Sequence, residues 1–151
     1  MNQPERALSL SWPWPHFMLA LPEQYRKRIE NRKPGFSHKS FRGECWVHVT
    51  PCKSRAAFAD AVSFARLHGV PDEHLAGIER EHPWVGHIVG AWEIVGMLPR
   101  PNLCELPDRW RMLDQVGFVV ANERTVSPVR CKGALGFWRV PNDVLAKLRH
   151  P

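Results

Sequence analysis

Proline content sets the strongest limit on what this chain can fold into. Fourteen of its 151 residues are proline, spread from the N-terminus to the last position. Because proline interrupts helices and the interior of sheets, we expect short elements joined by many turns. No apolar run approaches the roughly 18 residues needed to cross a bilayer. The first residues also lack the pattern of a secretory signal. The sequence therefore predicts one cytoplasmic domain over residues 1–151.

The pattern of apolar residues predicts a mixture of strands and short helices. Glycines 90 and 96, inside the clearest strand, indicate bulges or close backbone contacts there. Several short strands with interspersed helices indicate an α+β fold with a curled sheet or small barrel. Strands are predicted at residues 7–10, 41–50, 86–98, 116–121 and 133–140, and helices at 16–21, 54–68, 71–82 and 142–149.

The strand predicted at residues 41–50 carries two different faces. Cys45, Val47 and Val49 alternate with Trp46, His48 and Thr50. Because successive side chains of a strand point to opposite faces, the pattern predicts a half-buried strand. His48 and Thr50 then lie on the face that could line a cleft.

The net charge of +6 is concentrated in the first third of the chain. Residues 1–55 contain ten Lys or Arg against four acids, whereas the remaining 96 residues contain eleven of each. Such a one-sided distribution favours a surface that binds an anionic ligand. A solvated basic loop with no ligand is the plainer interpretation.

Four segments of the chain form a pattern when read together: ALSLSWPW near the start, KRIENR at 27–32, RGECWVHV at 42–49 and CKGALGFW at 131–138. In this order they resemble the ASCH domain, a PUA-like β-barrel family proposed to bind RNA. The family typically carries the motif G-x-K-x-x-E-x-R, matched here by Lys27, Glu30 and Arg32, with Tyr25 in place of the glycine. The resemblance implies a PUA-like mixed β-barrel with a few peripheral helices. It also implies an RNA-binding cleft, with nuclease or base-modifying hydrolase activity in some relatives.

The spacing of Lys27, Glu30 and Arg32 has its own geometric consequence. In a flat strand Glu30 and Arg32 share a face and Lys27 lies opposite. The three side chains converge only if the chain turns between Lys27 and Glu30, as where a helical turn meets a strand. Glu30 could then act as acceptor and base, while Lys27 and Arg32 hold a phosphate or oxyanion. The alternative is a surface ion pair without function.

Further candidates surround this motif. Trp14 could supply a wall on which a base stacks, and Lys53 and Ser54 stand where a helix begins and a phosphate could bind. Ser127 is more simply a turn residue before Pro128. The candidate catalytic residues are Lys27, Glu30, Arg32 and His48, and the candidate RNA-binding residues are Trp14, Arg42, Thr50, Lys53, Ser54, Ser127, Arg130 and Lys132.

The sequence gives no sign of a cofactor or a metal. It has no Walker loop, no dinucleotide-binding fingerprint and no nucleophile elbow. Cys45 and His48 have opposite strand parity, and a fourth ligand beside Cys52 is not evident. The four cysteines, Cys104 and Cys131 included, show no paired spacing, and in a reducing compartment they are expected to be free thiols.

Three functions remain open from the sequence. The chain could be a metal-independent ribonuclease acting on single-stranded RNA, with Glu30 or His48 moving a proton. It could instead be an amidohydrolase that deacylates an acetylated cytidine nucleoside, with Lys27 and Glu30 activating water. It could also bind RNA or a modified base without turnover, and DNA is a weaker candidate for the ligand.

Overall fold

The described part of the chain forms a six-stranded sheet with three α-helices and two 3-10 turns. A computed structural model describes residues 4–102 and 109–150. In chain order the elements are β1 (Arg6–Ser11), α1 (Trp14–Leu19), η1 (Glu23–Tyr25), β2 (Ile29–Arg32), β3 (Gly43–Thr50), α2 (Arg55–Leu67), η2 (Asp72–His74), β4 (His87–Leu98), β5 (Val116–Arg130), β6 (Phe137–Arg139) and α3 (Asn142–Arg149).

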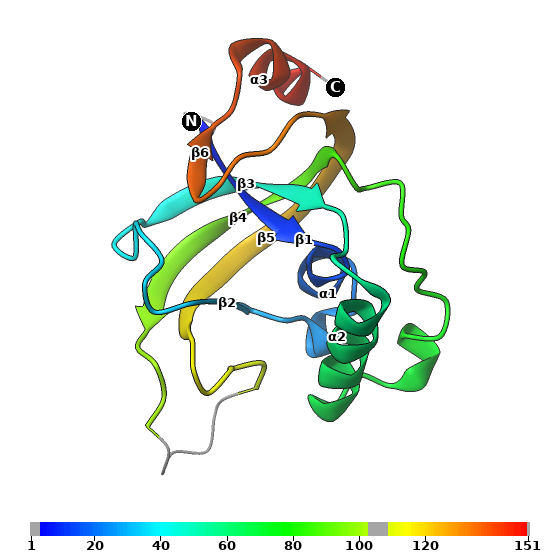
Figure 1. Cartoon of the computed structure of the whole chain (residues 1–151). Coiled ribbons are helices and arrows are strands. Elements are labelled where there is room, and N and C mark those ends of the chain that lie inside the picture. Colours follow the sequence, from blue (N-terminus) through cyan, green and yellow to red (C-terminus); the bar gives the residue numbers. More distant parts are fainter. Residues whose placement is uncertain (1–3, 103–108, 151) are drawn as a thin grey trace.

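The strands form one mixed sheet in the order β2-β5-β4-β3-β1-β6. β1 and β3 are parallel, with Ser9 opposite His48, and the other neighbours are antiparallel. The sheet curls into a half-barrel, with α1 and α2 together at one end and α3 beside β6 at the other (Figure 1). This α+β architecture is compatible with the mixed barrel expected from the sequence.

β3 is buried on both faces, so the prediction of a half-buried strand was wrong. Trp46 and His48, on the face expected to be open, are 1% and 3% exposed. One face of β3 contributes Val47 to the main core, while Trp46 joins a second cluster with α3. β3 lies between β4 and β1 in the middle of the sheet, and other parts of the chain pack over both of its faces.

Several predicted elements are confirmed. β1 and α3 cover their predicted ranges, and β4 and α2 match theirs to within one residue at each end. The hydroxyl of Ser54 caps α2 by accepting a hydrogen bond from Ala57 N at 3.0 Å. Gly90 and Gly96 mark shifts in the register between β4 and β5. A Cβ atom at Gly90 would lie 2.5 Å from the carbonyl oxygen of Arg124. Glycine is therefore required there by close backbone contact.

Three predicted elements differ from the structure. The helix expected over residues 71–82 is only the short turn η2, and Gly77 within the expected range disfavours a longer helix. The strand expected to end at residue 121 continues to Arg130, since pairing with the long β4 extends it through a polar sequence. The last strand covers only residues 137–139. None of the helices in residues 4–102 and 109–150 is long and apolar enough to cross a membrane.

Candidate functional site

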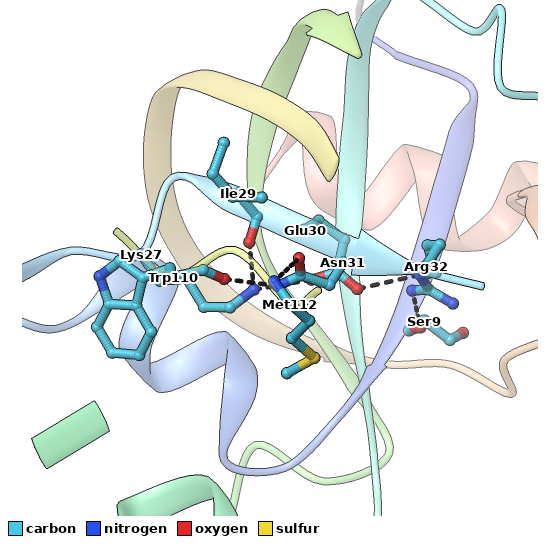
Figure 2. A network of polar contacts seen from close by, with 8 residues as sticks. All are labelled: Ser9, Lys27, Ile29, Glu30, Asn31, Arg32, Trp110 and Met112. Atoms are coloured by element: carbon cyan, nitrogen blue, oxygen red, sulfur yellow. Dashed lines mark hydrogen bonds and ion pairs between the residues drawn. The ribbon is translucent and has the colours of Figure 1, made fainter. Parts of the chain in front are cut away.

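The side chains of Lys27, Glu30 and Arg32 meet at a bend in the chain. Lys27 follows the turn η1 and precedes β2, so it does not follow the alternation of the strand. Lys27 Nζ lies 3.6 Å from Glu30 Oε2, and Arg32 Nε lies 3.0 Å from Glu30 Oε1. Glu30 therefore lies between the two cations (Figure 2). The junction of a helical turn and a strand produces the convergence that the spacing required.

This group of charges is largely removed from solvent. Lys27 is 2% exposed and Glu30 7%. Lys27 Nζ also donates a hydrogen bond to the carbonyl of Ile29. Burial lowers the pKa of Lys27, because it penalises the charged form, and the nearby charge of Glu30 opposes this effect only in part. An amine with a lowered pKa gives up its proton more readily than a surface lysine.

The three charges lie against a hollow of about 780 Å³, which we call the Lys27 hollow. Its lining holds four cationic residues and one carboxylate, that of Glu30. Two aromatic rings contact the cations: Lys27 Nζ lies 5.3 Å from the Trp14 ring centroid, and the Arg32 guanidinium 5.2 Å from that of Phe36. The lining residues are Ser9, Leu10, Ser11, Trp14, Lys27, Glu30, Asn31, Arg32, Lys33, Gly35, Phe36, Thr50, Lys53, Met112 and Gln115.

A second hollow of about 680 Å³ lies beneath the segment that joins β5 to β6, and we call it the loop hollow. It shares Ser9, Arg32 and Thr50 with the Lys27 hollow, so the two are neighbours. Its lining residues are Ser9, Arg32, His48, Val49, Thr50, Pro51, Gly86, Arg130, Cys131, Lys132, Gly133, Ala134, Leu135 and Gly136.

His48 joins the loop between β5 and β6 to the sheet through hydrogen bonds. His48 Nε2 lies 2.8 Å from the carbonyl oxygen of Cys131, and Nδ1 lies 3.1 Å from Ser9 Oγ. Because a carbonyl only accepts, Nε2 carries the ring proton and Nδ1 accepts from the Ser9 hydroxyl. Ser9 Oγ in turn accepts from Trp138 Nε1 at 3.0 Å. Burial lowers the pKa of His48, which agrees with a neutral ring whose two nitrogens are both engaged.

Gly133 allows the loop to lie directly on the histidine ring. A Cβ atom at this position would lie 2.5 Å from His48 Cε1 and 2.8 Å from Ser9 Oγ. Any side chain would therefore push the loop away from the sheet. The glycine makes the close approach possible, and with it the shape of the loop hollow.

The other sequence-predicted residues divide between the hollows and the surface. Thr50, Lys53, Arg130 and Lys132 line one hollow or both. The remaining three are not among the lining residues of either. Arg42 donates to the carbonyls of Lys39 and Phe41 at 3.0 and 2.7 Å. Ser54 is engaged as the cap of α2. Ser127 is exposed within β5, so its prediction as a turn residue was wrong.

Sequence reasoning missed nine lining residues of the Lys27 hollow, and four of them are Asn31, Phe36, Met112 and Gln115. Asn31 Nδ2 donates to the carbonyl of Trp110 at 2.8 Å, and Asn31 Oδ1 accepts from Met112 N at 3.1 Å. These bonds fix the segment that carries Met112 against β2 (Figure 2). The place of Asn31 inside the motif could have drawn attention to it. No sequence pattern around Met112 and Gln115 indicates a role in the site, because the fold brings them there from a distant part of the chain.

The described residues do not assemble a metal site. Within residues 4–102 and 109–150, no group of three or more His, Cys, Asp or Glu side chains could hold a metal ion. Cys45, Cys52 and Cys131 are free thiols, as predicted, and Cys104 lies outside the described residues. No protein-family model matches the chain, and the search of curated proteins finds no match either.

Proposed function

We propose that this chain is an RNA-binding protein of the ASCH type, with a PUA-like fold, that takes single-stranded RNA into the Lys27 hollow. The observation that carries the proposal is the buried Lys27–Glu30–Arg32 group at the wall of that hollow. Removing charges from water costs several kcal/mol per ion unless they are well paired. Perturbed ionisable groups in a hollow are more frequent at functional sites than elsewhere.

Charge and aromatic surface in the Lys27 hollow both suit a nucleotide. Arg32, Lys33 and Lys53 offer positive charge to a phosphate, and Lys53 is exposed at the rim. Trp14 and Phe36 offer aromatic surface for a base. Positive charge beside aromatic rings is the combination used by proteins that bind single strands without strict sequence preference.

We further propose that the Lys27–Glu30 pair gives the site metal-independent ribonuclease activity. Glu30 accepts the proton of the ribose 2′-hydroxyl, whose oxygen attacks the neighbouring phosphorus, while Lys27 and Arg32 stabilise the charge on the phosphate oxygens. The bond from phosphorus to the 5′-oxygen of the next nucleotide breaks, which leaves a 2′,3′-cyclic phosphate, and the departing 5′-oxygen takes a proton from the Lys27 ammonium. His48 is assigned a positioning role instead, because both of its ring nitrogens are engaged by Ser9 and Cys131.

The second candidate is hydrolysis of an acetylated cytidine nucleoside. It is favoured by the lowered pKa of Lys27, which suits an amine that activates water. A hollow of about 780 Å³ also falls within the usual range for small-molecule sites. In this reaction only the nucleoside needs to enter the Lys27 hollow.

Incubation of the purified protein in EDTA with single-stranded RNA, matching DNA and acetylated cytidine separates these functions. We expect products from RNA alone. Release of acetate would select the second candidate, and binding of RNA without products would identify a binding module. Absence of RNA binding would overturn the proposed function.

Two variants and a control test whether RNA cleavage and RNA binding depend on the Lys27 hollow. Replacing both residues of the buried pair, Lys27→Met with Glu30→Gln, should lower the cleavage rate about 10²- to 10⁴-fold. Lys53→Ala should mainly weaken RNA binding, because its side chain is exposed at the rim. Lys147→Ala, on the remote helix α3, is the control and should change neither.

A further inference from the structure

The loop hollow carries cationic side chains and no carboxylate in its lining. Arg32, Arg130 and Lys132 line it, and its lining includes no Asp or Glu. Arg130 and Lys132 are exposed, and within the described residues no salt bridge joins either of them to a carboxylate. Cations gathered around a hollow without a carboxylate produce a field that attracts an anion.

Arg32 stands where the two hollows meet, since it lines both. Its Nε donates to Glu30 and one terminal nitrogen donates to the carbonyl of Ser9 at 3.0 Å. A guanidinium has five N–H donors, and these contacts to described residues occupy two of them. Arg32 is therefore held in place and still has donors for a ligand that passes from one hollow to the other.

We propose that the loop hollow is a phosphate-binding subsite for a second nucleotide, so that the ligand is an RNA strand of at least two nucleotides. The phosphate that links the two nucleotides lies at Arg32, and Arg130 with Lys132 holds the next phosphate along the strand. This inference rests on the proposed function, because it takes RNA to be the occupant of the Lys27 hollow.

The subsite is formed in advance of binding. The hydrogen-bonded chain from Trp138 through Ser9 to His48 ends on the carbonyl of Cys131, at the start of the loop. Gly133 then lies in contact with the His48 ring. A loop held in this way costs less ordering entropy on binding than a free one.

Affinity as a function of strand length tests the subsite. Cytidine monophosphate, the dinucleotide carrying a terminal phosphate besides the linking one, and the tetranucleotide are titrated in EDTA as 2′-O-methyl forms, which block attack by the ribose hydroxyl. In the native protein the dinucleotide should bind about tenfold more tightly than the monophosphate, because a charge-assisted phosphate contact is gained. Equal affinities would overturn the subsite.

A double variant tests whether Arg130 and Lys132 cause that gain in affinity. Arg130→Ala with Lys132→Ala should remove the tenfold advantage and leave the affinity for the monophosphate unchanged. The slope of log affinity against log salt should fall by about 0.7 for each phosphate that the variant no longer neutralises. The matched control is Lys147→Ala with Arg149→Ala, two exposed cations of α3. A double variant that behaves like this control would overturn the proposal.

Two further measurements separate the possible failures. Unmodified single-stranded RNA of twelve nucleotides should bind the native protein. If it does not, the proposed function fails and the subsite fails with it. If it binds while the double variant matches the control, only the subsite fails. Inorganic phosphate that binds as tightly as the dinucleotide would show a site for the free ion and would overturn the strand assignment.

Discussion

The two hollows differ in how they hold their charges. In the Lys27 hollow, Lys27 and Glu30 are buried and joined to each other, so the charges depend on internal partners. In the loop hollow, Arg130 and Lys132 are exposed, and the buried polar group is the neutral ring of His48. The first arrangement fixes a small reactive group in place. The second offers cations that are available to a ligand and contribute little to the fold.

This difference follows from where the residues lie in the fold. Glu30 and Arg32 lie on β2, a strand at the border of the sheet, and the preceding bend turns Lys27 back towards them. Arg130 and Lys132 lie where β5 passes into the loop, at the surface. Substitutions of the buried Lys27–Glu30 pair should therefore change stability strongly, and those of the exposed cations should change binding.

The largest effect is expected for Glu30→Gln. This substitution removes the carboxylate that balances the buried Lys27, and breaking one partner of a buried pair costs about 3–5 kcal/mol in the free energy of unfolding. Chemical unfolding at pH 7 measures the change. Lys27→Met combined with Glu30→Gln should recover much of the loss, because no buried charge is then left alone. A double variant less stable than Glu30→Gln would contradict this interpretation.

The next effect concerns His48 and pH. Burial lowers the pKa of His48 below its ordinary value of 6.5, so the unfolded chain binds the proton more readily than the folded one. The stability that depends on neutral His48 is present above about pH 6.5 and is lost as the pH falls through the lower folded value. His48→Gln should cost about 1–3 kcal/mol at pH 7, because buried partners are left unsatisfied. It should also flatten the decline of stability in acid.

Unfolding from pH 7.5 to 4.5 tests this pH dependence. His16, whose pKa is lowered to about 4, gives a slope of the same sign that should persist in the His48→Gln variant. An identical slope in the native protein and the variant would argue against a neutral His48 in the fold.

A smaller effect is expected for Asn31→Ala. The substitution removes both hydrogen bonds that hold the Trp110 and Met112 backbone against β2. We expect a loss of about 1–2 kcal/mol and weaker ligand binding in the Lys27 hollow, which loses a fixed wall. Asn142→Ala, at the exposed start of α3, is the control. Unchanged stability of Asn31→Ala would show that segment 110–112 is held by packing alone.

The smallest effect on stability is expected for Lys132→Ala. Its side chain is exposed, and substitutions at such positions usually change the free energy of unfolding by less than about 0.5 kcal/mol. Thermal unfolding of the variant should therefore coincide with that of the native protein. A clear loss of stability would mean that Lys132 is part of the fold, and the contrast between the hollows would not hold.

The sequence predicted those parts of the fold and site that depend on neighbouring residues. Helix α2 follows from the Ser54 cap and the apolar spacing after it, and Gly90 marked a close backbone contact. Lys27, Glu30 and Arg32 lie within six residues, so a single bend could bring them together. The sequence could not predict the length of β5, because its polar second half is held by pairing with β4.

The candidate site shows the same division. Thr50 is the last residue of β3, Lys53 follows shortly after it, and Arg130 and Lys132 lie beside the loop, so their chain positions already placed them near a cleft. Ser127 was predicted to lie in a turn because a proline such as Pro128 usually interrupts a strand. In the structure Pro128 lies where the pairing of β5 with β4 shifts register, so the strand continues through both residues. Met112 and Gln115 could not be found, since only the fold carries them to β2.

The sequence by itself determined the features that depend on neighbouring residues. These are the helix caps, the alternation in the strands, the basic first third of the chain and a charged motif short enough for its side chains to converge at one bend. The tertiary structure alone decided which side chains are buried. His48 lies on a face that the alternation predicts to be open, yet it is covered because β3 is a central strand and Gly133 brings the loop onto its ring. Local pattern fixes the direction of a side chain relative to its own strand. Burial also depends on the other segments that pack against it, and these come from distant parts of the chain.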